Sequence, residues 1–192
     1  MNTLQNGNKL AVLVSNGFNE KDLVDVQRVL LGEGVSMRII SMDNGLTSSW
    51  NGSDWGLNFA ADSALNTALA ADYDMLVVPG GQRSVDKLKH TAHTRRFING
   101  FVDQSKPVVV MGEALELLEF AGKLSGMTVC GDEAKREMAE QAGATWVEDG
   151  FVVDGVNLNG GKNQTKVTAE EYWTYVGGRG APIGEAFTYS AT

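Results

Sequence analysis

The chain has 192 residues, of which 43% are hydrophobic and 21% charged, as expected for one soluble globular domain. Its 24 acidic and 16 basic side chains leave a net charge of −8, which argues against nucleic acid and anionic membranes as partners. Cys130 is the only cysteine, which excludes an internal disulfide, and no apolar run reaches the length of a membrane span, so we expect a cytoplasmic protein.

The first part of the chain predicts strands that alternate with helices. Lys9–Ser15 is a near-continuous apolar run, which is typical of a parallel strand covered on both faces. Asn19 can cap a helix that runs to about Leu31, and Val35–Ser41 predicts a second strand, so that the three form a βαβ unit. Two short antiparallel strands, a short helix and a core strand are predicted next, at Ser48–Trp50, Trp55–Asn58, Ala64–Ala71 and Asp74–Val78.

The second part continues the alternation. Helices are predicted at Ser84–Lys89, Thr94–Gln104, Glu113–Ala121 and Glu133–Ala142. Strands are predicted at Pro107–Met111 and Met127–Cys130, and edge strands at Ala144–Val147, Phe151–Val153 and Val156–Leu158. Residues 160–192 are rich in glycine and aromatic residues and predict a C-terminal extension with one helix at Ala169–Val176. With no internal repeat and no linker, residues 1–192 are expected to form a single domain.

This order predicts an α/β protein of the flavodoxin-like type, a three-layer sandwich. Its central sheet is mostly parallel, with helices on both faces and a small antiparallel hairpin. Ligands of such folds bind at the carboxyl ends of the strands. Three strand ends, at Ser15–Glu20, Pro79–Gly81 and Met111–Glu113, are expected to converge on one cleft if neighbouring strands supply them.

Four stretches resemble the ThiJ/PfpI superfamily, which has a class I glutamine amidotransferase-like fold. They are KLAVLVSNGFNEKDLVDV, ADYDMLVVPGG, KPVVVMGEALELLEFAG and LSGMTVCGDEAKREMAEQAGATWVEDGFVVDG, in this order along residues 9–158. The resemblance implies a strand-to-helix elbow that carries a cysteine, usually followed by histidine. It also implies a carboxylate from the first helix and backbone amides that form an oxyanion site. Superfamily members include peptidases, chaperone-like proteins, glyoxalases and deglycases.

The elbow of this chain departs from that pattern. The superfamily cysteine falls on Gly112 and the histidine on Glu113, while the first-helix carboxylate falls on Asp22 and the Pro-Gly-Gly segment is kept at Gly80 and Gly81. Glycine followed by an acidic residue is similar to the elbow in the C-terminal domain of large-subunit catalases, which also lacks the nucleophile. The resemblance therefore implies a binding cleft made by Asp22, Gly80, Gly81, Gly112 and Glu113, without its central thiol.

Glu113 and Asp22 are the two candidate catalytic residues. If both carboxyls face one cleft, each raises the pKa of the other, and a carboxyl with a raised pKa can act as a general acid or base. Each also falls in the first turn of a predicted helix, where acidic side chains are common because the helix dipole favours them. The sequence leaves both interpretations open.

The remaining reactive side chains give weak signals. Cys130 precedes a helix, but the nearby Asp132 and Glu133 oppose a thiolate. His90 and His93 are too few to hold a metal ion, and we expect them in a loop between two helices. We therefore predict no metal and no cofactor.

Two kinds of function remain open. The first is a non-catalytic protein that binds a small molecule, acts as a chaperone or serves in a stress response. The second is a hydrolase, glyoxalase or lyase that uses Glu113 and Asp22 as acid and base, or a member called a peptidase by family name only. The resemblance also implies a homodimer or larger homo-oligomer. Trp50 and Trp55, which flank a tight turn, are expected to pack over the first helix or at a contact between copies.

Overall fold

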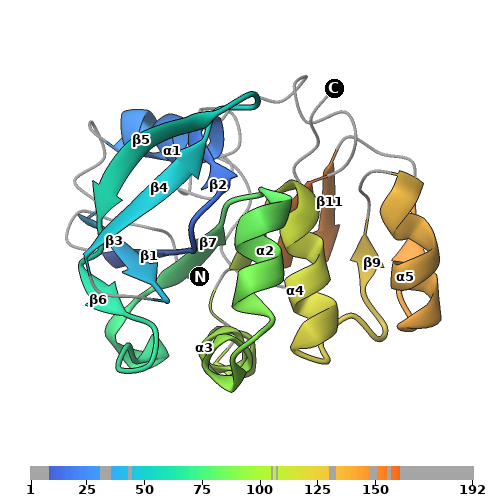
Figure 1. Ribbon diagram of the computed structural model, residues 1–192. Helices are drawn as coiled ribbons and strands as arrows, with labels where there is room; N and C mark the ends of the chain where they lie inside the picture. The colour runs from blue at the N-terminus through green and yellow to red at the C-terminus, as the bar shows by residue number, and fades with distance from the viewer. Residues whose placement is uncertain are drawn as a thin grey trace.

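The computed structural model describes residues 9–30, 36–42, 45–104, 106, 108–129, 133–147, 151–154 and 157–160. In this part of the chain a seven-stranded sheet is accompanied by two small sheets and by helices (Figure 1). Every neighbouring pair in the large sheet is parallel except the pair formed by Phe151–Asp154 and Asn157–Gly160, which is antiparallel. The predicted α/β sandwich with a mostly parallel sheet is confirmed.

The large sheet has the strand order β11-β12-β8-β7-β1-β3-β6. Its strands are β1 (Lys9–Val14), β3 (Ser36–Ser41), β6 (Ser63–Ala64), β7 (Met75–Val78), β8 (Val108–Val110), β11 (Phe151–Asp154) and β12 (Asn157–Gly160). The chain moves from β1 to β3 on one side and then returns to β7 on the other side of β1. Such a reversal of strand order is the usual position of a ligand site in an open α/β sheet.

The apolar runs of the sequence are long because the sheet is covered on both faces. Ala11 and Leu13 of β1 belong to the same core as the helical residues Val85, Phe97 and Leu115. The alternate residues Leu10 and Val12 are also fully buried. The helices are α1 (Glu20–Leu30), α2 (Gln82–Leu88), α3 (Ala92–Asp103), α4 (Leu115–Phe120) and α5 (Arg136–Gln141). Short 3-10 turns lie at η1 (Ala70–Asp72), η2 (Gly112–Ala114) and η3 (Glu133–Lys135).

The predicted antiparallel hairpin is present and belongs to a small three-stranded sheet. Its strands, β4 (Leu46–Trp50) and β5 (Trp55–Ala60), are each longer than expected. A two-residue strand, β2 (Phe18–Asn19), pairs in parallel with β4 and was not predicted. This pairing attaches the hairpin to the segment that leaves β1, and Figure 1 shows the hairpin standing beside α1 and β2.

The helix predicted at Ala64–Ala71 is wrong. Ala64 pairs with Ser41 in β6, and the amide of Leu65 donates to the carbonyl of Ser41 across 2.7 Å. Extending the sheet satisfies these backbone groups in place of a helix, and only the 3-10 turn η1 follows. The run of alanines and leucines favours a helix locally, but the edge of β3 offers partners that a local pattern does not reveal.

The C-terminal strands also differ from the prediction. β12 is not an edge strand, because it pairs in parallel with β8 and antiparallel with β11. The strand predicted at Ala144–Val147 is β10 (Thr145–Trp146), which leaves the main sheet and pairs with β9 (Thr128–Val129). The extension predicted at 160–192 and its helix lie outside the described residues, apart from Gly160 at the end of β12.

No helix in the described ranges has both the length and the apolar character that crossing a bilayer requires.

Candidate functional site

The candidate site lies where three neighbouring strands end. β8, β7 and β1 are adjacent in the sheet, and each leads into one of the three segments that were expected to converge. The amide of Asn19 donates to the carbonyl of Gly80 across 2.8 Å, and the amide of Met111 donates to the carbonyl of Val78 across 3.0 Å. The structure thus brings these strand ends together through their backbones.

Asp22 and Glu113 meet at the Gly80-Gly81 segment. The amide of Gly80 donates to Asp22 Oδ2 across 2.9 Å, and the amide of Gly81 donates to Glu113 Oε2, also across 2.9 Å. Both oxygens lie within 3.3 Å of the point that a Cβ on Gly80 would occupy, so the two carboxyls are close neighbours. Two successive amides therefore each hold one carboxyl group.

The two glycines are required by this close approach. A Cβ on Gly80 would lie 2.8 Å from Glu113 Oε2 and 3.0 Å from the carbonyl oxygen of Met111. Gly81 has a φ of 107°, and a Cβ there would lie 2.5 Å from the carbonyl oxygen of Gly17. A side chain at either position would displace the backbone or the carboxyls, so only glycine presents both amides to them.

The elbow carries no side chain at its tip. Gly112 has a φ of 53° and opens the turn η2, directly after the extended residue Met111. The side chain that enters the site from the elbow is that of Glu113, which the turn directs onto the amide of Gly81. A carboxylate thus occupies a donor of the segment that the superfamily resemblance assigns to an oxyanion site.

Asp22 reaches the site from the first turn of α1. Asn19 caps this helix as predicted, since the amide of Asp22 donates to Asn19 Oδ1 across 3.3 Å. Burial raises the pKa of the Asp22 carboxyl from 3.8 to about 7, and the negative charges of Glu113 and Asp25 add to the rise. The hydrogen bond from Gly80 and the charge of Lys21 act in the opposite direction. Asp22 therefore titrates near neutral pH.

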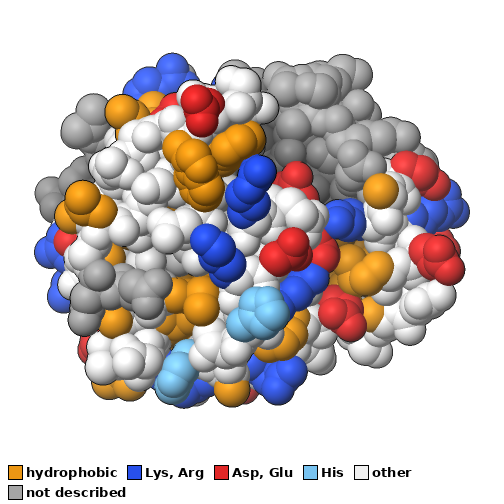
Figure 2. Space-filling model, in the orientation of Figure 1, with side chains coloured by type: hydrophobic (Ala, Val, Ile, Leu, Met, Phe, Trp, Pro, Cys, Tyr) orange, Lys and Arg blue, Asp and Glu red, His pale blue; other side chains and the backbone are white. Residues whose placement is uncertain are grey.

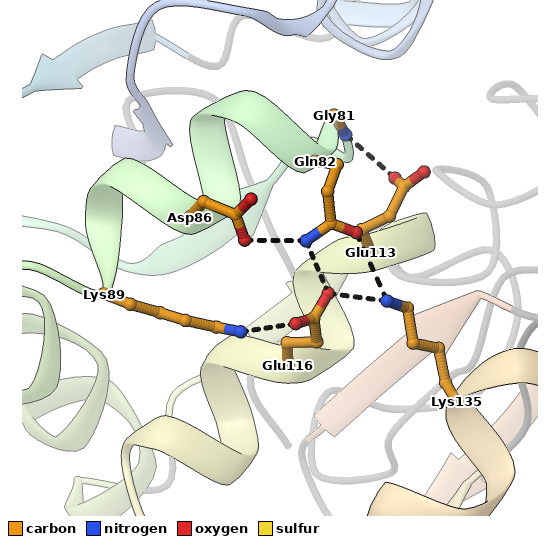
Figure 3. Close-up of polar contacts among 7 residues, drawn as sticks. All are labelled: Gly81, Gln82, Asp86, Lys89, Glu113, Glu116 and Lys135. Atoms are coloured by element: carbon orange, nitrogen blue, oxygen red, sulfur yellow. Dashed lines mark hydrogen bonds and ion pairs between the residues drawn. The ribbon is translucent and has the colours of Figure 1, made fainter.

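A second polar cluster lies beside the pair and is centred on Glu116, one helical turn beyond Glu113 (Figure 3). Its carboxyl accepts from Lys89, from Lys135 across 2.8 Å and from Gln82 Nε2 across 2.9 Å. Burial by itself would raise the pKa of Glu116, which is 13% exposed, but the bonds from Lys135, Lys89 and Gln82 lower it below its ordinary value. Glu116 is therefore ionised and joins α2, α4 and η3.

Other predicted candidates do not join the site. Cys130 lies outside the described residues. His90 lies between α2 and α3 as expected, but His93 lies within the first turn of α3 and not in the loop. In the ranges that the structure describes, no three side chains of the histidine, cysteine, aspartate and glutamate types gather as metal ligands would.

No sequence pattern singles out Glu116, Lys89, Lys135 or Arg83. Glu116 follows Glu113 at a spacing of three, which places both on one side of a helix, but this spacing alone does not reveal the lysines. Arg83 follows Gly81 closely and contacts Trp50 through its guanidinium group. Trp50 lies 33 positions earlier in the chain, a separation that no local pattern spans.

The amino-acid sequence also matches a known protein family. The family model described as the DJ-1/PfpI family matches residues 8–168. The chain belongs to the DJ-1/PfpI family. The family resemblance seen in the sequence is confirmed.

Curated relatives of this DJ-1/PfpI protein carry different names. General stress protein 18 of Bacillus subtilis is 26% identical over 147 residues, which cover 77% of this chain and 84% of that protein. Deglycase PfpI of Pyrococcus furiosus is 24% identical over 147 residues, covering 77% and 86%. Catalase-2 of Bacillus subtilis is 31% identical over 111 residues, which cover 58% of this chain but 15% of that protein, in keeping with the likeness to a catalase domain.

Solved structures share the fold. A ThiJ/PfpI domain protein from Brachyspira murdochii superposes with a TM-score of 0.77 at 18% identity, covering 91% of this chain and 96% of that one. A two-domain protein from Anabaena variabilis, with DJ-1/ThiJ/PfpI-like and ferritin-like domains, gives a TM-score of 0.80 at 22% identity, covering 92% of this chain and 50% of that one. At this identity the likeness shows the fold alone.

Proposed function

We propose that this DJ-1/PfpI protein acts in a stress response as a non-catalytic protein. One observation carries the proposal: Gly112 offers no nucleophile, and the adjacent Glu113 occupies the amide of Gly81. Covalent catalysis needs a nucleophilic side chain with an activating partner. An oxyanion site needs amides that are free to receive the developing charge. The name of General stress protein 18, a relative over most of its length, supports the stress-related part of the proposal.

The proposal is tested by assaying the purified protein with methylglyoxal and with a fluorogenic peptide. We expect no turnover of either compound above the buffer blank. The variants Glu113→Gln and Cys130→Ser are assayed beside the wild type. Turnover that is lost in Glu113→Gln would show acid–base catalysis, and turnover that is lost in Cys130→Ser would show thiol chemistry from outside the elbow. Either result, or turnover that persists in both variants, would overturn the proposal.

The second candidate function is acid–base catalysis by the carboxyl pair. It is favoured by the pKa of Asp22, which burial raises to about 7, because a group that titrates near neutral pH can both give and take a proton. Glu113 would supply the second carboxyl beside it. We rank this function second because each carboxyl already has an oxygen bound to a backbone amide.

A further inference from the structure

A cluster of two tryptophans and one arginine lies outside the carboxyl pair. The rings of Trp50 and Trp55, at the tip of the β4–β5 hairpin, meet edge to face with centroids 5.5 Å apart. The Arg83 Cζ atom, at the start of α2, lies 4.0 Å from the Trp50 ring centroid and 5.9 Å from that of Trp55. Figure 2 shows hydrophobic side chains at this hairpin tip with a basic side chain against them.

Arg83 is held in place along its whole length. A Cβ on Gly17 would lie 2.5 Å from Arg83 Cβ and 3.2 Å from Arg83 Cδ, so the aliphatic stem lies directly on the backbone of Gly17. Gly17 has a φ of 92°, which glycine adopts without strain. With the stem on Gly17 and the guanidinium on Trp50, this cation is positioned before any ligand arrives, which lowers the entropic cost of binding.

The guanidinium keeps its hydrogen-bonding edge unused. Among the described residues the Arg83 side chain makes no hydrogen bond and no ion pair, whereas the Arg95 side chain donates to the carbonyl of Phe120 and that of Arg96 to those of Leu65 and Ala68. Stacking on a ring uses the flat face of a guanidinium and leaves its N–H groups in the plane. These donors match the two oxygens of a carboxylate.

Two acidic side chains close to the hairpin, Glu20 and Asp54, are engaged elsewhere. Glu20 accepts from the hydroxyl of Ser49 across 2.8 Å and from the amide of Leu57 across 2.6 Å. Asp54 Oδ1 accepts from the amide of Trp55 across 2.8 Å. Neither contact uses the guanidinium, so its positive charge is available to an anion despite the acidic character of the whole chain.

The surroundings of Arg83 are apolar and exposed. Trp55 is 49% exposed and Leu57, two residues further along β5 and therefore on the same face of the strand, is 58% exposed. A ligand that binds Arg83 through a carboxylate can lay a flat apolar body against these side chains. Aromatic rings with a few placed polar groups are the usual lining of small-molecule sites.

We propose that Trp50, Trp55 and Arg83 form a binding site for a small organic carboxylate with an aromatic or flat apolar body. The arginine binds the carboxylate and the tryptophans contact the body. This site is distinct from the Asp22–Glu113 pair, and it holds whether or not that pair has a catalytic role.

The probe pair is phenylacetate and its neutral analogue phenylacetamide, measured by isothermal titration calorimetry with the full chain. We expect saturable binding of phenylacetate with a Kd of the order of 1 mM or below, which is within reach of a ligand of this size. Phenylacetamide lacks the charge and is expected to bind at least about tenfold more weakly, because charge-assisted hydrogen bonds are the stronger ones.

The variant Arg83→Met keeps an aliphatic stem on Gly17 and removes the charge, so it should weaken phenylacetate binding at least about tenfold. Trp55→Ala removes the exposed ring that would contact the apolar part of the ligand. It should weaken the binding of phenylacetate and of phenylacetamide alike. The control is Lys87→Met, which removes an exposed cation of the same helix one turn later and should leave the affinity unchanged. Circular dichroism confirms that each variant is folded.

Several results would overturn the proposal. Equal binding of phenylacetate and phenylacetamide, or unchanged affinity in Arg83→Met, would exclude carboxylate recognition. No binding up to about 20 mM, a concentration that detects even very weak sites, would exclude the site itself. If Arg83→Met lowers the thermal midpoint of unfolding while the wild type binds neither probe, the stacked arginine serves only to attach the β4–β5 hairpin to α2. If the wild type binds neither probe and Trp55→Ala dissociates an oligomer in sedimentation velocity, the cluster is a contact between copies.

Discussion

At the scale of single residues, Asp22 and Glu113 show how one segment satisfies two acidic groups. A carboxyl taken out of water loses its hydration, and this loss is tolerable only when the group gains hydrogen bonds or a proton. Glu113 gains the amide of Gly81, and Asp22 gains the amide of Gly80 and, near neutral pH, a proton. Asp22 therefore couples the stability of the protein to pH.

Asp22→Asn should remove this dependence on pH. Because the folded protein holds a proton on Asp22 up to about pH 7 and the unfolded chain releases it near pH 3.8, the free energy of unfolding of the wild type falls as pH rises between these values. The raised pKa of Asp22 corresponds to about 4 kcal/mol over this range. The difference in unfolding free energy between Asp22→Asn and the wild type should therefore shift by this amount in favour of the variant as pH rises from about 4 to 8. Urea unfolding at a series of pH values measures this shift.

The control for that measurement is Asp103→Asn, which alters an exposed aspartate that pairs with Lys123 across 2.9 Å. Its unfolding free energy should follow that of the wild type at every pH to within about 0.5 kcal/mol. Parallel curves for the wild type and Asp22→Asn would contradict the raised pKa of Asp22.

At the scale of elements, Glu116 joins three pieces of structure that do not neighbour one another in sequence. Lys89 comes from the segment after α2, Glu116 from α4 and Lys135 from η3, and Figure 3 shows the two lysines approaching the carboxyl from opposite sides. Gln82 also donates to Glu116 and follows Gly81, so the cluster adjoins the segment that holds the carboxyl pair.

Glu116→Ala should lower the free energy of unfolding by about 2–3 kcal/mol, because it leaves two partly buried lysines without their shared partner. Urea denaturation measures this loss. Asp103→Ala is the matched control, since it breaks the ion pair with Lys123 at an aspartate that is 59% exposed, and it should cost less than about 1 kcal/mol. Equal losses in the two variants would show that the Glu116 cluster contributes no more than a surface ion pair.

Helices and strands with a clear pattern of apolar residues were predictable from the sequence. Strands whose pairing depends on a partner far away in the chain were not. The apolar runs that became β1 and β7 are continuous because helices and strands cover both faces of the sheet. The sequence predicts a helix that begins within β6, because among the described strands β6 pairs only with the edge of β3, which a local pattern does not reveal. β12 was mistaken for an edge strand because its place between β8 and β11 depends on which strand it reaches.

At the scale of the whole molecule, the net charge of −8 sets which partners the surface attracts. We predict no measurable binding to duplex DNA or to vesicles rich in anionic lipid at about 0.15 M salt, because both require a basic surface. Fluorescence anisotropy with labelled DNA and co-sedimentation with vesicles measure this, with a basic protein of similar size as the positive control. Binding of either with a Kd below about 10 µM would contradict the prediction.

The sequence by itself determined the α/β class, the alternation of the main strands and helices, the cap of α1 at Asn19 and the absence of a nucleophile at Gly112. These features follow from local propensity, apolar period and residue identity, which are all written along the chain. The sequence also identified the two carboxyls as candidates. Their being neighbours depended on whether their strand ends converge, which the sequence did not establish.

Only the tertiary structure decided what those side chains contact. It placed Asp22 and Glu113 on successive amides, gathered Lys89 and Lys135 around Glu116, and laid Arg83 on Trp50. The hydrogen bonds among these contacts join residues that lie from 19 to 58 positions apart in the chain. The physical reason is that hydrogen bonds, stacking and burial depend on distance in space, which the order of residues fixes only through the complete fold.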